Sequence, residues 1–188
     1  MSIDFDPIPP LEEYRLDDYL VTEPISGNKL TITDPYEKMT RDFDVVTNNA
    51  AQCAKALLEF ARWYFQDPQN DPVGRYDEFG CVDFGDLLFL IFRGDGNQFF
   101  YFERMDLKTL LDSLNDLNLH NANFMLWCEG PDDEPQPSRE TFDTIIDKVA
   151  DYLVPDGGFY QWTTYSKNPD ITKMVYSVFL KGLKKDNH

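Results

Sequence analysis

Apolar residues recur every three or four positions in three parts of the chain, which is the period of an amphipathic helix. The first part follows residue 48, where Thr47 or Asn48 can cap a helix that ends before Pro68. Its apolar stripe consists of Ala50, Ala54, Leu57, Ala61 and Tyr64. Such a stripe is typical of a helix that packs on a core.

Two further helices are predicted with a polar capping residue in front of each. Asp106 caps the second, whose leucines are Leu107, Leu110, Leu111, Leu114 and Leu117. Ser138 caps the third, and Gly157-Gly158 ends it. The inner face of this third helix consists of Phe142, Ile145, Ile146, Val149 and Leu153.

Shorter apolar runs predict strands. Residues 87–93 and 98–103 flank Gly94-Asp95-Gly96-Asn97, whose residues tolerate positive φ, so two strands joined by a turn are expected. The unbroken apolar run Leu87 to Phe92 favours a central strand covered on both faces. The other predicted strands are 123–128, a hairpin of 19–23 with 29–33, and a closing pair at 159–165 and 173–180.

Together these elements predict an α+β fold, with a mostly antiparallel sheet of about five to seven strands and about three helices packed on it. The length of 188 residues favours a single globular domain, 1–188. Within it we expect an acidic, proline-bearing N-terminal arm, 1–44, that packs on a core of residues 45–182. Residues 183–188 are expected to be a disordered tail.

Acidic residues outnumber basic ones by 34 to 17, which gives a formal net charge of -17. Hydrophobic residues make up 42% of the chain and aromatic residues 15%, so this charge belongs to a folded protein. A net charge of about 2–8 suffices for the solubility of a small domain, and a larger charge destabilises the fold by repulsion. An acidic host proteome or a surface for a basic partner would each explain the excess. Direct binding to nucleic acid or to an anionic membrane is disfavoured.

The acids concentrate in two segments. Residues 67–86 carry six acids against Arg75, and residues 129–156 carry nine against Arg139 and Lys148. On the third helix, acids step by three, four and four residues on the face opposite the apolar one, and Lys148 can pair with two of them. The same spacing recurs on the second helix, and an acidic proline loop spans 129–137. We define the candidate acidic surface as Asp112, Asp116, Asp132, Asp133, Glu134, Glu140, Asp143, Asp147 and Asp151. A merely solvated helix face would show the same stripe.

The sequence predicts no catalytic, metal-binding or cofactor-binding residues. His120, expected in a loop, is the one non-terminal histidine that could act as a general base. The cysteines Cys53, Cys81 and Cys128 are odd in number and lack Cys-x-x-Cys spacing, which favours free thiols in a reducing compartment. Neither a signal peptide nor a membrane-spanning run is present, so the sequence predicts a cytoplasmic protein.

These observations favour a non-enzymatic inhibitor that occludes a basic, nucleic-acid-binding surface of a partner protein. The partner would be a nuclease, a toxin or a nucleic-acid-binding enzyme. An immunity protein or a phage anti-defence protein that mimics nucleic acid would fit this description. A small enzyme or ligand-binding domain with an aromatic-lined pocket is the first alternative. The second is a structural or assembly subunit that uses aromatic residues such as Tyr160 and Trp162.

Overall fold

A mixed sheet with the strand order β1-β2-β3-β4-β7-β5-β6 organises the chain in the computed structural model. The structure describes residues 21–34, 38–47, 49–66, 90–153 and 161–186. The strands are β1 (Val21–Ser26), β2 (Lys29–Asp34), β3 (Met39–Val45), β4 (Gln98–Met105), β5 (His120–Gly130), β6 (Gln161–Lys167) and β7 (Val175–Leu183). The helices are α1 (Ala50–Gln66), α3 (Leu107–Ser113), α4 (Arg139–Val149) and the 3-10 turn η3 (Ala150–Tyr152).

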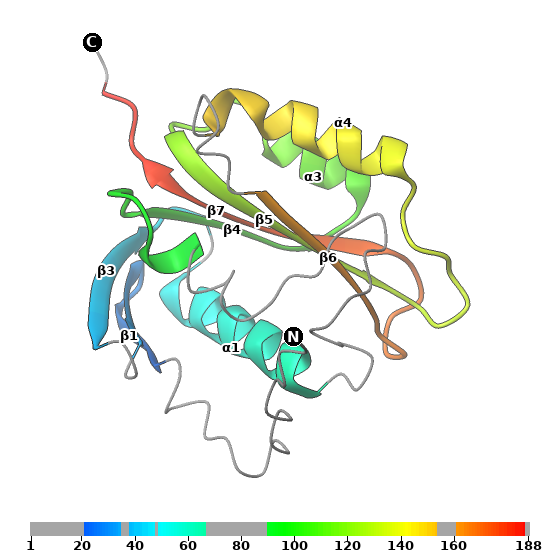
Figure 1. The fold of residues 1–188 in the computed structure, drawn as a ribbon, viewed down its shortest axis with the longest axis horizontal. Coiled ribbons are helices and arrows are strands. Elements are labelled where there is room, and N and C mark those ends of the chain that lie inside the picture. The colour runs from blue at the N-terminus through cyan, green and yellow to red at the C-terminus, as the bar shows by residue number, and fades with distance from the viewer. Residues whose placement is uncertain (1–20, 35–37, 48, 67–89, 154–160, 187–188) are drawn as a thin grey trace, which may run out of the picture.

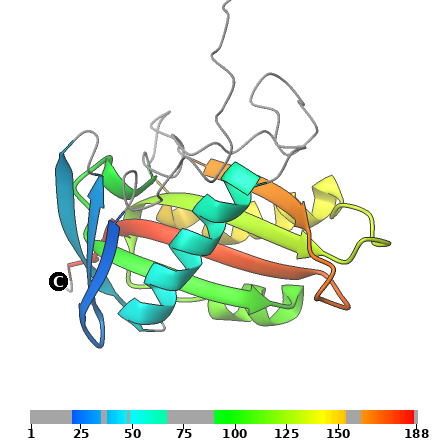
Figure 2. The same ribbon diagram turned by 90° about the horizontal axis from the view of Figure 1, so that it is seen from below.

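Helices cover both faces of this sheet. Figure 1 shows α3 and α4 on one face and α1 on the other, and Figure 2 shows α1 crossing the sheet. Four neighbouring strand pairs are antiparallel, whereas β3–β4 and β5–β6 are parallel. The predicted α+β fold with a mostly antiparallel sheet and about three helices is therefore confirmed.

Each face of the sheet has its own hydrophobic core. The core beneath α1 contains Leu57, Phe99 and Phe179, all fully buried. The core beneath α3 and α4 contains Phe124 and Ile145, also fully buried. Side chains along a strand alternate between the two faces, so the middle strands contribute to both cores. Every helix in the described ranges is too short or too polar to traverse a bilayer.

The capping residues of α3 and α4 are those that the sequence predicts. The carboxylate of Asp106 accepts a hydrogen bond from the Thr109 N–H at 2.8 Å, and this bond lowers the pKa of Asp106. The hydroxyl of Ser138 accepts one from the Thr141 N–H at 3.2 Å. Both side chains satisfy N–H groups that the first helical turn leaves without a partner.

The cap of α1 differs from the prediction. Asn49 accepts from the Gln52 N–H at 2.9 Å, and the Gln52 side chain accepts from the Asn49 N–H at 3.3 Å. This reciprocal pair is a capping box. Thr47 instead bonds the backbone of Tyr101, with distances of 2.8 Å to its carbonyl and 2.7 Å from its N–H. Asn48 lies outside the described residues.

The strand predicted at 87–93 is wrong over its described residues. Residues 90–92 are helical, and 87–89 lie outside the described residues. Leu90 and Ile91 are fully buried, so the apolar run was interpreted correctly for burial and wrongly for backbone conformation. A short apolar run does not distinguish a buried strand from a buried helical turn. β4 is the central strand of the sheet, and β7 lies beside it in the interior, between β4 and β5.

The last two strands, β6 and β7, form as predicted but are not paired with each other. β5 separates them, and β6 pairs with β5 in parallel at the edge of the sheet. Strand order depends on contacts between distant segments, so the local pattern could not supply it.

The predicted N-terminal hairpin is present as β1 and β2, which pair antiparallel. The sequence missed β3, which lies mostly within the segment interpreted as an arm. β3 joins this meander to the rest of the sheet through two residue pairs, Asp44 with Gln98 and Val45 with Phe99. Residues 1–20 of the arm lie outside the described residues.

Candidate functional site

The acidic stripe on α4 faces away from the core. Phe142, Ile145 and Val149 are buried against the sheet, whereas Glu140, Asp143 and Asp147 are exposed. Asp151 is also exposed, although it lies in the 3-10 turn η3 and not in α4 itself. The 3.6-residue period of the helix accounts for this separation of apolar and acidic faces.

One ion pair partly neutralises the stripe. Arg139 lies 3.9 Å from Asp143, and both side chains are well exposed, at 81% and 62%. The expected pairing of Lys148 with Asp147 or Asp151 is not formed. An exposed pair of this kind contributes little, so the stripe keeps most of its negative field.

The two acids expected on one face of the second helix are not on one helix. Asp112 lies on α3, where it pairs with Lys108 at 3.6 Å. Asp116 lies beyond the end of α3 and has a positive φ of 54°. α3 ends at Ser113, and the buried hydroxyl of Tyr152 donates to the carbonyl of the capping residue Leu114 at 2.9 Å. This bond satisfies a carbonyl at the end of the helix from another part of the chain.

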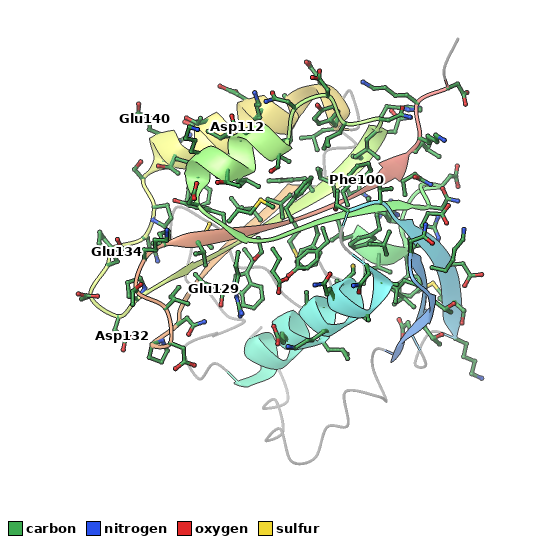
Figure 3. The ribbon with its side chains drawn as sticks, turned by 180° about the vertical axis from the view of Figure 1, so that it is seen from behind. Phe100, Asp112, Glu129, Asp132, Glu134 and Glu140 are labelled. Carbon is green, nitrogen blue, oxygen red and sulfur yellow. The ribbon has the colours of Figure 1, made fainter. Side chains whose placement is uncertain are left out.

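The loop that precedes α4 carries the remaining candidate acids. Asp132 and Asp133 are exposed, whereas Glu134 is half-buried and its N–H donates to the Pro131 carbonyl at 3.1 Å. Figure 3 shows Asp132 on this loop beyond the end of β5, with Asp112 on α3 and Glu140 at the start of α4. The structure thus places the candidate acidic surface on the α3–α4 layer and on one loop at its end.

Glu129 does not belong to the acidic loop in which the sequence analysis placed it. It lies within β5, which continues to Gly130, and its side chain is 3% exposed. The carboxylate accepts from the Arg104 Nε at 2.9 Å and from the Asn168 Nδ2 at 2.9 Å. Figure 3 places Glu129 between the sheet and α1. Its alternation with Met125 and Trp127, both buried beneath α1, was the signal that could have identified it.

Arg104 connects this buried carboxylate to the surface. Its φ of 42° is unusual for a residue other than glycine, and it lies in an irregular part of the β4–β7 pairing between Phe102 and Met105. The guanidinium also lies 3.8 Å from Glu59 of α1, and its hydrogen bond to Glu129 raises the pKa of Arg104. The cluster joins β4, β5 and the loop before β7, so its evident role is structural.

Two cysteines and one histidine in the described ranges are poorly placed to act as nucleophile or base. Burial raises the pKa of the Cys53 thiol to about 12 and that of Cys128 well above its usual value, which disfavours the reactive thiolate. Both cysteines are free, and Cys81 lies outside the described residues. His120 is the first residue of β5 and not a loop residue, and its Nδ1 is buried without a hydrogen-bond partner. The described ranges hold no group of three or more His, Cys, Asp or Glu residues suited to a metal ion.

Comparison with known proteins adds little to this description. No protein family and no curated protein matches the sequence. Among solved structures, a mutant FtsZ from M. jannaschii has a TM-score of 0.42 and 14% identity, over 74% of this chain and 43% of that one. An empty FtsZ dimer from M. jannaschii has a TM-score of 0.40 and 15% identity, over 71% of this chain and 38% of that one. Similarity at this level supports no functional argument.

Proposed function

We propose that this protein is a non-enzymatic, cytoplasmic inhibitor that occludes a basic, nucleic-acid-binding surface of a partner protein. It would act as an immunity protein or as a phage anti-defence protein that mimics nucleic acid. The observation that carries the proposal is the exposed acidic stripe of α4, in which Glu140, Asp143 and Asp147 share one ion pair, Arg139–Asp143.

The charge imbalance of this layer supports a binding role. Residues 106–118 and 131–151 together contain ten acids and three bases. Like charges four residues apart on a helix are unfavourable by about 0.2–0.5 kcal/mol per pair, as for Asp143 and Asp147. A surface that is unfavourable for the fold is often maintained for recognition.

The mechanism would be competition for the partner's cationic side chains. Carboxylates accept charge-assisted hydrogen bonds from Arg and Lys, as phosphate oxygens do. The net charge of -17 would steer a basic partner toward the acidic layer and accelerate association. Salt would slow this association because it screens exposed charges.

The experiment compares two variants, one that lacks three charges of the stripe and one that lacks three charges elsewhere. The unmodified chain is first used to isolate its partner from the native host. Association rates are then measured at low and high salt for the Asp143→Asn, Asp147→Asn, Asp151→Asn triple variant. The matched control is Asp42→Asn, Glu103→Gln, Asp170→Asn, three exposed acids outside the α3–α4 layer.

We expect the stripe variant to associate more slowly at low salt and to lose much of its salt dependence. The control has the same net charge as the stripe variant. Its association should therefore be slowed only as far as long-range attraction depends on net charge. Equal rates for the stripe variant and the unmodified chain at both salt concentrations would contradict the proposal. Equal slowing in both variants would show a nonspecific effect of net charge and would also contradict it.

A further inference from the structure

Residues 91–96 run between β3 and β7, and five of their six carbonyl groups accept hydrogen bonds from two cationic side chains. The Arg41 guanidinium of β3 donates to the carbonyls of Phe92 at 3.1 Å, Gly94 at 2.5 Å and Gly96 at 3.0 Å. The carbonyls of Ile91 and Arg93 accept from the Lys181 ammonium of β7, the first at 3.2 Å. One short segment is thus held from two different strands.

The Lys181 end of this arrangement is deeply buried. Lys181 is only 1% exposed, and Asn123 lies directly opposite it on β5. The Asn123 amide donates to the Arg93 carbonyl at 3.5 Å, but its own oxygen is buried without a hydrogen-bond partner. A buried amide oxygen without a donor is unfavourable, so this site is incompletely satisfied in the observed state.

The segment sits tightly against β7. A Cβ atom on Gly96 would lie 2.4 Å from the carbonyl carbon of Gly182, so only glycine permits this approach. Such close packing excludes water from Lys181 as long as the segment stays in place. Water could hydrate Lys181 only if the segment moved away.

The surroundings of Lys181 disfavour its protonated form, chiefly through burial. Burial is the larger effect, and the nearby Arg41 adds to it, whereas Asp95 acts in the opposite direction. Together they lower the pKa of Lys181 to about 7. A neutral amine retains two N–H donors, which match the two carbonyls that Lys181 holds.

We propose that residues 91–96 form a proton-sensitive clasp between β3 and β7, which opens when Lys181 takes up a proton. In the closed state burial disfavours the ammonium, and in the open state water stabilises it. Opening is therefore coupled to proton uptake. The pKa of Lys181 is lower in the closed state than in the open one. The closed state therefore becomes more stable relative to the open state as the pH rises. The opening equilibrium should grow about tenfold for each unit that the pH falls toward 7, and should level off below 7.

The clasp adjoins the weakest connection of the sheet. β3 and β4 share two residue pairs, and the Asp44 N–H donates to the carbonyl of Asn97, the residue that follows the clasp, at 2.9 Å. The Val46 N–H donates to Phe99 at 2.9 Å across the same junction. Opening of the clasp would therefore loosen the β1–β2–β3 meander from the rest of the sheet.

Hydrogen exchange of the full chain between pH 6 and pH 9 tests the clasp. After correction for intrinsic exchange, we expect the protection of the Asp44 and Val46 amides to fall about tenfold per unit from pH 9 to 7, and to stay constant below 7. Lys181→Met keeps the side chain's length without the charge and should abolish this dependence. Lys184→Met removes an exposed charge nearby and should leave it unchanged.

A titration of the unmodified protein keeps the proposal testable if Lys181→Met does not fold. The NMR signals of the lysine ε-methylene groups should include one that titrates near pH 7. If every lysine titrates above pH 9, the clasp does not take up the proton and the proposal is wrong. Protection that is independent of pH between 7 and 9 in the unmodified chain would overturn it equally.

Discussion

The two faces of the sheet bury different kinds of side chain. The core beneath α3 and α4 consists entirely of hydrophobic residues. By strand alternation, all the buried polar and charged residues in the described ranges lie on the α1 side: Asp34, Asn123, Glu129, Ser177 and Lys181. The α3–α4 side carries its charges on the outer surface of its helices instead.

This difference separates two tasks. Apolar burial is non-directional, so the α3–α4 core stabilises the sheet mainly through packed volume, with the Tyr152 hydroxyl as a directional contact to the end of α3. A buried charge needs partners at defined positions, as Glu129 has in Arg104 and Asn168. The α1 side therefore specifies how segments meet, whereas the outer surface of α3 and α4 can vary in charge with little structural consequence.

The largest expected effect comes from removing volume from the apolar core. Phe124→Ala should lower the free energy of unfolding by about 3–5 kcal/mol, because Phe124 is fully buried in β5. Urea denaturation would measure the loss, which should be the same at pH 6 and pH 9. Phe124→Leu should lower the free energy of unfolding far less, by about 1 kcal/mol. Equal losses for Ala and Leu would show that this face does not depend on packed volume.

A smaller effect is expected from the buried carboxylate of the α1 side. Glu129→Gln preserves the volume of the side chain but removes the charge that pairs with Arg104. We therefore expect the free energy of unfolding to fall by about 1.5–3 kcal/mol. Glu59→Gln is the matched control, since Glu59 lies 3.8 Å from the same guanidinium but is 33% exposed. Its loss should stay below about 1 kcal/mol. A double-mutant cycle with Arg104→Met that gives no coupling to Glu129 would refute this assignment.

The smallest effect, of opposite sign, is expected on the acidic outer surface. Asp147→Asn should stabilise the fold by about 0.2–0.5 kcal/mol, because it relieves repulsion from Asp143 one turn away. Asp143→Asn should be nearly neutral, since it also removes the ion pair with Arg139. Thermal unfolding of the two variants side by side would resolve the difference. Destabilisation by Asp147→Asn would mean that the stripe has a structural role.

Local patterns in the sequence were sufficient for much of the fold. The caps at Asp106 and Ser138 and the hairpin of β1 and β2 depend on neighbouring residues, and all were predicted. The position of β7 and the helical conformation of residues 90–92 depend on distant contacts, and both were missed. The exposure of the α4 stripe also followed from period alone.

The buried charges are harder to predict. Glu129 and Lys181 each stand where an apolar run meets a charged segment, so alternation along the strand is the local signal of their burial. Their partners, Arg104 and the carbonyls of Ile91 and Arg93, are 25 to 90 residues away. Which partners these buried charges meet is decided by strand pairing, so the partners became visible only with the sheet order.

The position of β7 has a consequence for how the chain assembles. β7 follows the other six strands of the described sheet in the sequence, yet it lies in the interior of that sheet, between β4 and β5. During synthesis, β4 and β5 must therefore leave the ribosome with their facing edges unpaired, while the β1–β2–β3 meander can form from local contacts alone. The nascent protein would expose the unpaired edges of β4 and β5, which can pair with other chains, until β7 is synthesised and inserts between them.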